Sequence, residues 1–285
     1  MPEPACRELL GESSEFNVQL FSGSSPDPER RPKTRMLQRA RERHGEGKFV
    51  AFQTNCPSAG WRRFGSAASW NDVLPEMAHL PASSRHLYEI ILDGRPCKPY
   101  LDVDLEHAVD GWGQDRIVDT LSMLTLRIFN DDFGIALPKD SLCWSSSSKA
   151  AKTSLHLVIS THAPQHLFAT NRGKVQGSAF CFAFRLRQLL ADVAPAEVVE
   201  AVDARVYSKD REMRVVGSTK FSAKDRPLVK LTQQDTADFL ITCTDDDWKA
   251  VEVPENILAA IAARDTDDSC EVRSTTSLAS TISRD

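Results

Sequence analysis

The stretch Cys97–Glu106 carries three acidic residues that alternate with apolar ones, Asp102, Asp104 and Glu106. In an extended strand alternate side chains share one face, so the two aspartates would point at the same spot. Like charges held that close raise each other's pKa, and a divalent cation between them is the simplest way to offset the repulsion. The alternative is an exposed edge strand with its acidic face in water. Glu106 would replace Asp104 as a metal ligand if Asp104 is dispensable.

A second polar strand face follows at Lys152–Ile159, where Lys152, Ser154 and His156 would lie side by side. Further along, the acid Asp203 precedes three spaced cations, Arg211, Arg214 and Lys220. Oxygen ligands from three acids suit two divalent metals, and the cations with the Ser and His groups suit the phosphates of a nucleotide and a nucleic-acid backbone. The order of these groups predicts a nucleotidyl-transfer site.

Each of these groups also has a structural interpretation. His156 could be a core histidine with a satisfied ring nitrogen, Asp203 could cap a turn, and the three cations could form a solvated rim. Other functions compete as well. A metal-dependent nuclease would use the acids without needing the Lys152 strand face, and a scaffold would leave the acids without a cation. A catalytically silent module that binds single-stranded DNA would rely on stacking aromatics, and the chain has only 3 Tyr and 5 Trp.

The motifs resemble the archaeo-eukaryotic primase superfamily, and most closely its eukaryotic primase-polymerases (PrimPol). The resemblance covers roughly residues 40–245 and is carried by His86–Glu89, Cys97–Asp104, Lys152–Ile159, Val202–Arg214 and Ser218–Lys220. It implies catalytic, metal-ligating roles for Asp102, Asp104 and Asp203, which would hold two Mn²⁺ or Mg²⁺ ions. It implies nucleotide contacts for Tyr88, Lys152, Ser154, His156, Arg211, Arg214 and Lys220. It also implies a DNA contact for Arg62.

Two departures from that family bear on activity. Asp104 stands where these proteins usually have Glu, which keeps the charge and shortens the reach. The family also carries a Cys/His zinc-binding module associated with starting new chains. Beyond Lys220 this sequence has only Cys243 and Cys270 and no histidine, so no zinc site is visible. We therefore expect extension of a primer and little unprimed synthesis.

Composition sets the wider frame. The chain has 285 residues, 41% of them hydrophobic, so it can bury a sizeable core. The net charge of −5 means that a nucleic acid would have to bind at a local basic surface. Seven cysteines without a C-x-x-C pair, and no signal peptide, predict a reducing intracellular compartment. The apolar runs are too short to predict a membrane span. The resemblance implies the nucleus, the mitochondrion or both, with single-stranded template, primer, dNTP or NTP and a single-strand-binding protein as partners.

The sequence predicts an α+β fold divided into four segments: a flexible arm (1–35), an α/β module (36–95), a catalytic module (96–245) and an acidic, mostly disordered tail (246–285). Helix-prone residues predict a helix at 36–46, and a capping box formed by Ser69 and Asp72 predicts one at 69–80 in spite of Pro75. Further helices are predicted at 115–133, 178–193 and 255–264, the first two from their apolar spacing. The sequence predicts strands at 48–53, from 61 onward, and at 85–92, 98–106, 152–159 and 213–216. The Asp93-Gly94 turn predicts a hairpin between 85–92 and 98–106. The resemblance adds an RRM-like catalytic sheet flanked by helices, with the active site in the cleft between the two modules.

Overall fold

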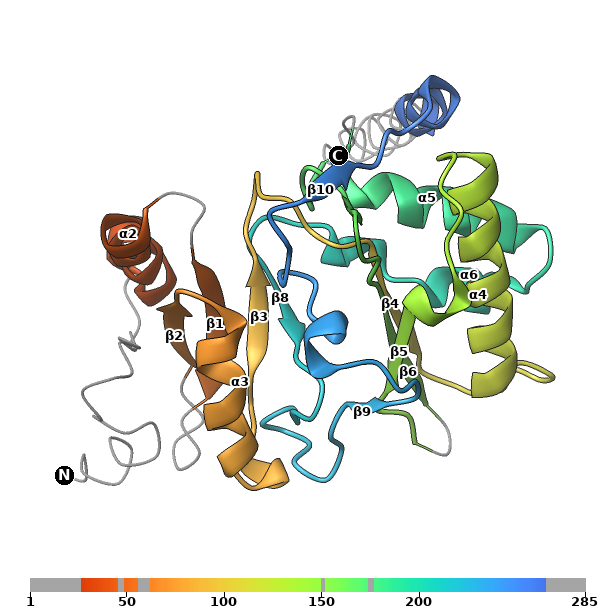
Figure 1. Cartoon of the computed structure of the whole chain (residues 1–285). Helices are drawn as coiled ribbons and strands as arrows, with labels where there is room; N and C mark the ends of the chain where they lie inside the picture. Colours follow the sequence, from red (N-terminus) through yellow and green to blue (C-terminus); the bar gives the residue numbers. More distant parts are fainter. Residues whose placement is uncertain (1–26, 46–48, 56–61, 150–151, 174–176, 265–285) are drawn as a thin grey trace, which may run out of the picture.

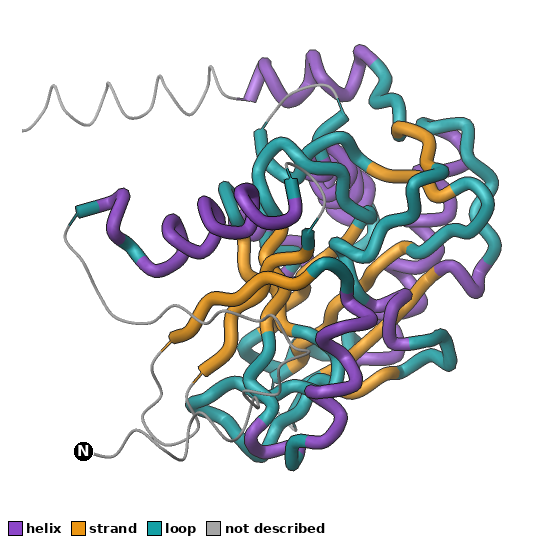
Figure 2. The backbone as a smooth tube through the Cα atoms, turned by 60° about the vertical axis from the view of Figure 1, so that its left-hand side comes forward, coloured by secondary structure: helices purple, strands orange, loops and turns teal. Residues whose placement is uncertain are grey.

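A computed structural model describes residues 27–45, 49–55, 62–149, 152–173 and 177–264. It has an α+β fold, in which helices flank two separate antiparallel sheets of four strands each (Figure 1). Figure 2 shows the strands passing through the middle of the molecule with helices on their outer sides. Most of the predicted arm (1–26) and the end of the predicted tail (265–285) lie outside the described residues.

The first sheet has the strand order β2-β1-β3-β8. Its strands are β1 (Val50–Asn55), β2 (Arg62–Ala67), β3 (Tyr88–Ile91) and β8 (Arg211–Arg214). Strand β8 therefore comes from the predicted catalytic segment and pairs with β3 of the preceding one, with Tyr88 opposite Arg214. The division into modules at residue 95 stays a prediction. The first sheet contains strands from both sides of that boundary.

A helix covers each face of the first sheet. Helix α2 (Pro32–His44) packs on one face through its buried residues Met36, Leu37 and Ala40. Helix α3 (Trp70–His79) packs on the other face through Trp70, Val73 and Met77. The predicted capping box is present, since the Asp72 carboxylate accepts a hydrogen bond from the Ser69 N–H at 2.9 Å. Pro75 lies inside α3 without ending it.

The second sheet has the order β4-β6-β5-β9 and carries the acidic strand. Its strands are β4 (Tyr100–Leu105), β5 (Leu142–Ser146), β6 (Thr153–Ile159) and β9 (Val229–Lys230). Helices α4 (Gln114–Asp131) and α5 (Ala179–Ala191) pack against it in the largest apolar core, as their periodicity predicts. The opposite, polar face of β4 and β6 is left for the candidate site.

The remaining elements lie around this core. They are the parallel pair β7 (Gln165–Leu167) and β10 (Trp248–Ala250), helix α6 (Ala196–Ala201), and the 3₁₀ turns η2 (Pro28–Arg30), η3 (Ala82–Ser84), η4 (Lys139–Ser141), η5 (Ala204–Val206) and η6 (Thr236–Phe239). A helix over 255–264 buries Ile257 and Ile261 in the main core. Residues 248–264, which we expected within a mostly disordered tail, therefore contribute to the fold. No described helix has the length and apolar character needed to cross a bilayer.

The predicted hairpin between 85–92 and 98–106 is wrong. Strand β3 pairs with β1 and β8, whereas β4 pairs with β6 in the other sheet. The backbone between them has other partners, because the Cys97 N–H donates to Phe168 O and the Lys98 N–H to Ile241 O. Pro96 and Pro99 have no N–H to offer a hairpin ladder. The Asp93-Gly94 turn is thus followed by a crossing from one sheet to the next.

Candidate active site

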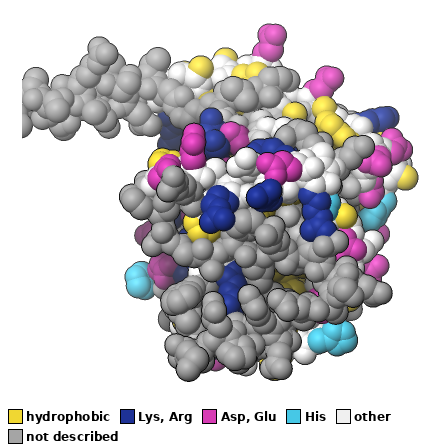
Figure 3. All heavy atoms as spheres, turned by 90° about the vertical axis from the view of Figure 1, so that its left-hand side faces the viewer, with side chains coloured by type: hydrophobic (Ala, Val, Ile, Leu, Met, Phe, Trp, Pro, Cys, Tyr) yellow, Lys and Arg dark blue, Asp and Glu magenta, His cyan; other side chains and the backbone are white. Residues whose placement is uncertain are grey.

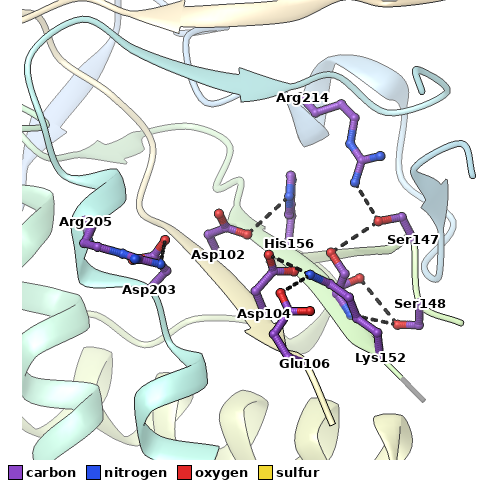
Figure 4. A network of polar contacts seen from close by, with 11 residues as sticks. Asp102, Asp104, Glu106, Ser147, Ser148, Lys152, His156, Asp203, Arg205 and Arg214 are labelled. Atoms are coloured by element: carbon purple, nitrogen blue, oxygen red, sulfur yellow. Dashed lines mark hydrogen bonds and ion pairs between the residues drawn. The ribbon is translucent and has the colours of Figure 1, made fainter. Parts of the chain in front are cut away.

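Strand β4 places two carboxylates on the polar face of the second sheet. Leu101, Val103 and Leu105 are buried in the core, so Asp102 and Asp104 point the other way, as the alternation predicts. In the register with β6, Asp102 lies opposite His156 and Asp104 opposite Ser154. The sheet therefore brings the two predicted polar strand faces together as one surface (Figure 4).

Asp203 joins this surface from a separate segment. A bridge between Val103 and Val202, and a 2.9 Å hydrogen bond from the Asp203 N–H to Asp102 O, hold it beside β4. Its carboxylate also begins the turn η5 by accepting from the Arg205 N–H, so the capping interpretation is correct as far as it goes. The Arg205 guanidinium then grips both carboxylate oxygens, at 2.8 and 3.2 Å.

The three acids affect one another electrostatically. Burial, followed by the charges of Asp104 and Asp203, raises the pKa of Asp102 to about 7, although Arg211 and Lys220 pull it down. The pKa of Asp203 is lowered instead, because its hydrogen bonds to Arg205 outweigh its partial burial. A carboxyl whose pKa is raised by like charges gains from a nearby cation.

His156 faces the acids across the strand pair. Its Nε2 lies 3.4 Å from Asp102 Oδ1, and only 12% of its side chain is exposed. Burial, helped by the charge of Arg214, lowers its pKa to about 3. The imidazole is therefore neutral at pH 7, and its contact with Asp102 is a polar contact of a neutral ring. The core-histidine interpretation is right about burial, and the polar partner is a predicted site residue.

Lys152 lies between two acids, one on strand β4 and one directly after it. Its Nζ is 2.5 Å from Glu106 Oε1 and 3.2 Å from Asp104 Oδ2. Burial opposes its charge, but the hydrogen bond to Glu106 and the charge of Asp104 raise its pKa above the ordinary value. This ammonium group is permanently charged at neutral pH.

A serine network joins the two sheets at the site. The Ser147 hydroxyl donates to Ser154 Oγ at 3.2 Å and accepts from Arg214 Nη2 at 2.6 Å. Ser148 Oγ accepts from the Ser154 N–H at 3.0 Å. The sequence reasoning missed Ser147, Ser148 and also Arg205. The run Ser145–Ser148 opposite the Lys152 strand was the available signal, but a serine run is equally typical of a turn.

The other predicted residues lie at different distances from this centre. Tyr88 is half-buried opposite Arg214 in the first sheet. Arg211 and Lys220 are close enough for their charges to lower the pKa of Asp102. Arg62 lies on the far edge strand β2, with 67% of its side chain exposed and Glu212 Oε2 3.9 Å away.

No ready-made metal site of three or more His, Cys, Asp or Glu side chains is found within the described ranges. The residues nevertheless fit a divalent cation. Among those same residues, Asp104 Oδ1 is buried without a hydrogen-bond partner. The charges of Asp104 and Asp203 raise the pKa of Asp102. Oxygen donors of this kind suit Mg²⁺ and Mn²⁺. Asp203 would have to exchange its Arg205 contact to join them.

Comparisons with known proteins add a distant relative. No family model matches the chain. It is 23% identical over 197 residues to an uncharacterized putative helicase of Acanthamoeba polyphaga mimivirus, a match that covers 61% of this chain. The chain spans only 19% of the length of that viral protein.

Proposed function

We propose that this chain is an enzyme acting on nucleic acid, and more specifically the catalytic core of a template-dependent DNA primase-polymerase. The observation that carries the proposal is the single polar surface on which β4 and β6 meet. Asp102 and Asp104 lie there beside Asp203, directly across from His156 and Ser154. A group of acids next to a phosphate-binding surface is what nucleotidyl transfer requires.

The cationic and neutral side chains of the site are suited to binding the nucleotide. Lys152 and Arg214 approach the surface from opposite sides, and both are suited to the phosphates of an incoming nucleotide. The neutral His156 ring can donate one hydrogen bond to a phosphate oxygen. Tyr88, beside Arg214 in the first sheet, would lie along the sugar. These groups orient the nucleotide so that its α-phosphate faces a primer 3′-hydroxyl.

The three carboxylates would hold divalent cations, Mn²⁺ or Mg²⁺. When bound, such ions lower the pKa of the attacking hydroxyl and neutralise charge on the departing pyrophosphate. The chain itself contributes the rigid strand that fixes the spacing of Asp102 and Asp104. It also keeps His156 uncharged, so that this ring adds no positive charge beside the acids.

The viral relative supports the broad class only. Its description as a putative helicase fits an enzyme of nucleic acid, and the match leaves most of that protein uncovered. A helicase would need a phosphate-binding loop of the G-x-x-x-x-G-K-[ST] type, and this sequence contains none. The arrangement of acids and cations favours nucleotidyl transfer over strand separation.

Exposed cations on helix α2 support a nucleic-acid partner in spite of the net negative charge. Helix α2 carries exposed cations at Arg35, Arg39, Arg41 and Arg43. Figure 3, which views the side of the molecule where α2 and β2 lie, shows Lys and Arg side chains spread across it with acidic ones between them. These cations suit the phosphate backbone of a single-stranded template.

A primer-extension assay with Mg²⁺ and with Mn²⁺ tests the proposal. The wild-type chain should lengthen a labelled primer on a single-stranded template, and Asp104→Ala should abolish this. Asp119→Ala, an exposed carboxylate on α4, is the matched control and should behave as wild type. A shortened strand would instead identify a nuclease, and DNA binding without any extension would identify a silent binding module. A parallel reaction without primer measures initiation, for which we expect little product.

A further inference from the structure

The ammonium group of Lys152 is shared between two carboxylates with different surroundings. Glu106 Oε1 lies 2.5 Å from Nζ and belongs to a side chain that is 66% exposed. Asp104 Oδ2 lies 3.2 Å away and belongs to a side chain that is 33% exposed. Because Asp104 opposes Ser154 in the antiparallel register, the next positions on this face bring Glu106 across from Lys152 (Figure 4).

This sharing creates a conflict that Glu106 can resolve. The function proposed above uses Asp104 for a cation and Lys152 for a phosphate. An ammonium group resting on Asp104 would compete with a divalent cation for the same oxygen, and would itself be unavailable to the nucleotide. Glu106 pulls that ammonium toward the end of the strand, away from Asp102 and Asp203.

We propose that Glu106 is a positioning residue: it retains Lys152 at the rim of the site, which frees Asp104 for a cation and presents the ammonium group to the nucleotide phosphates. The inference rests on the proposed function and deepens it. Removal of the Glu106–Lys152 ion pair should cost little stability, because an ion pair with an exposed partner contributes little to folding. Substitutions of Glu106 should therefore leave the chain folded and change only binding.

Three measurements on four proteins and one control variant test this role. The wild type, Glu106→Gln, Lys152→Met and the double variant are each titrated with Mn²⁺ alone by calorimetry, and with a non-hydrolysable dATP analogue in the presence of Mn²⁺. Primer-extension kinetics supply KM and kcat for dNTP. Asp110→Asn, which removes an exposed negative charge close by in the chain, is the matched control for a general loss of charge.

We expect Glu106→Gln to raise KM for dNTP by roughly tenfold, the equivalent of one charge-assisted hydrogen bond, and to change kcat by less than about threefold. Mn²⁺ affinity should fall severalfold, because Lys152 would then settle on Asp104. In the Lys152→Met background the same substitution should have no further effect, and Asp110→Asn should match wild type.

Four outcomes would overturn the inference. Equal weakening of Mn²⁺ binding with and without Lys152 would make Glu106 a direct metal ligand. If Glu106→Gln changes binding no more than Asp110→Asn does, Glu106 acts only through its general negative charge. A wild-type chain that binds and extends normally, with Glu106→Gln unchanged, would remove the role of Glu106 while the proposed function stands. If the wild type binds neither Mn²⁺ nor nucleotide, the proposed function fails, and this inference fails with it.

Discussion

Two carboxyl groups on consecutive strands of different sheets have a similarly raised pKa but different polar surroundings. Glu89 on β3 and Asp102 on β4 both have a pKa raised to about 7, with burial as the main cause. Around Glu89 the other contributions lower the pKa, because Ile241 and Thr242 donate hydrogen bonds to its oxygens at 2.9 to 3.1 Å. Around Asp102 the next contributions raise it, because the neighbours Asp104 and Asp203 are acids.

The difference separates a structural acid from a chemical one. Glu89 is satisfied by donors and ties β3 to the segment that follows η6, so its environment is complete. Asp102 has a neutral imidazole and two like charges around it, which Arg211 and Lys220 offset only in part, so a bound cation would stabilise its carboxylate further. The pKa values alone would not have distinguished the two.

The strongest test of the comparison exchanges each acid for a neutral residue. Asp102→Asn should reduce primer extension by more than roughly 100-fold, because it removes a carboxylate from the centre of the site. Its thermal stability should equal or exceed that of the wild type, since repulsion among three acids is relieved. Differential scanning calorimetry beside the extension assay checks both. Near-normal extension by Asp102→Asn would remove it from the catalytic group.

Glu89→Ala should do the reverse and lower stability. The substitution leaves the N–H groups of Ile241 and Thr242 and the Thr242 hydroxyl without their acceptor in a buried place. We expect a loss of roughly 3–5 kcal/mol in the free energy of unfolding, measured by urea denaturation. The exposed Glu252→Ala is the control and should stay within about 0.5 kcal/mol. Equal stability of the two variants would contradict a structural role for Glu89.

The titration of Glu89 should also make the stability of the chain depend on pH. Its folded pKa of about 7 lies above the ordinary value of 4.5, so the folded chain keeps a proton that the unfolded chain releases between these values. The unfolding free energy of the wild type should therefore fall relative to Glu89→Gln as pH rises from 4.5 to 7, by on the order of 3 kcal/mol. Below 4.5 the two stability curves should run parallel. Parallel curves across the whole range would show that the hydrogen bonds balance burial and leave the pKa of Glu89 unshifted.

Strand alternation predicted the parts of the site that lie on regular elements. It placed Asp102 with Asp104, and Ser154 with His156, because a period of two fixes which side chains share a face. Asp203 came from the order of acids and cations along the chain and from the resemblance, since a residue at the start of a 3₁₀ turn has no periodic signal. Neither source indicated that Arg205 would bind Asp203, a contact set by the local turn η5, or that Ser147 would accept a hydrogen bond from Arg214, which depends on how distant segments pack.

The fold shows the same limit. Helices α4 and α5 follow from apolar periodicity, α3 from its capping box and α2 from its helix-prone composition, and all four end near the expected residues. Strand pairing does not follow from it: the turn at Asp93-Gly94 predicted a hairpin, while the chain used the next residues to cross to a second sheet. Strand β8 likewise joins a sheet whose other strands come much earlier in the sequence. Pairing between distant strands is decided by packing that a local pattern does not contain.

The smallest effect concerns Arg205, which gives Asp203 an ion-pair partner that Asp102 lacks. With 89% of its side chain exposed, Arg205 contributes little to folding, so Arg205→Ala should leave the unfolding midpoint unchanged. It should raise Mn²⁺ affinity by about two- to fivefold, because the Asp203 oxygens no longer have to leave a guanidinium before they meet a cation. Arg127→Ala removes a comparable exposed Arg–Asp pair from α4 and should leave the calorimetric Mn²⁺ titration as in wild type. If Arg205→Ala weakens Mn²⁺ binding instead, Arg205 orients Asp203 for the cation and does not merely occupy its oxygens, and the distinction drawn between Asp203 and Asp102 would have to be reversed.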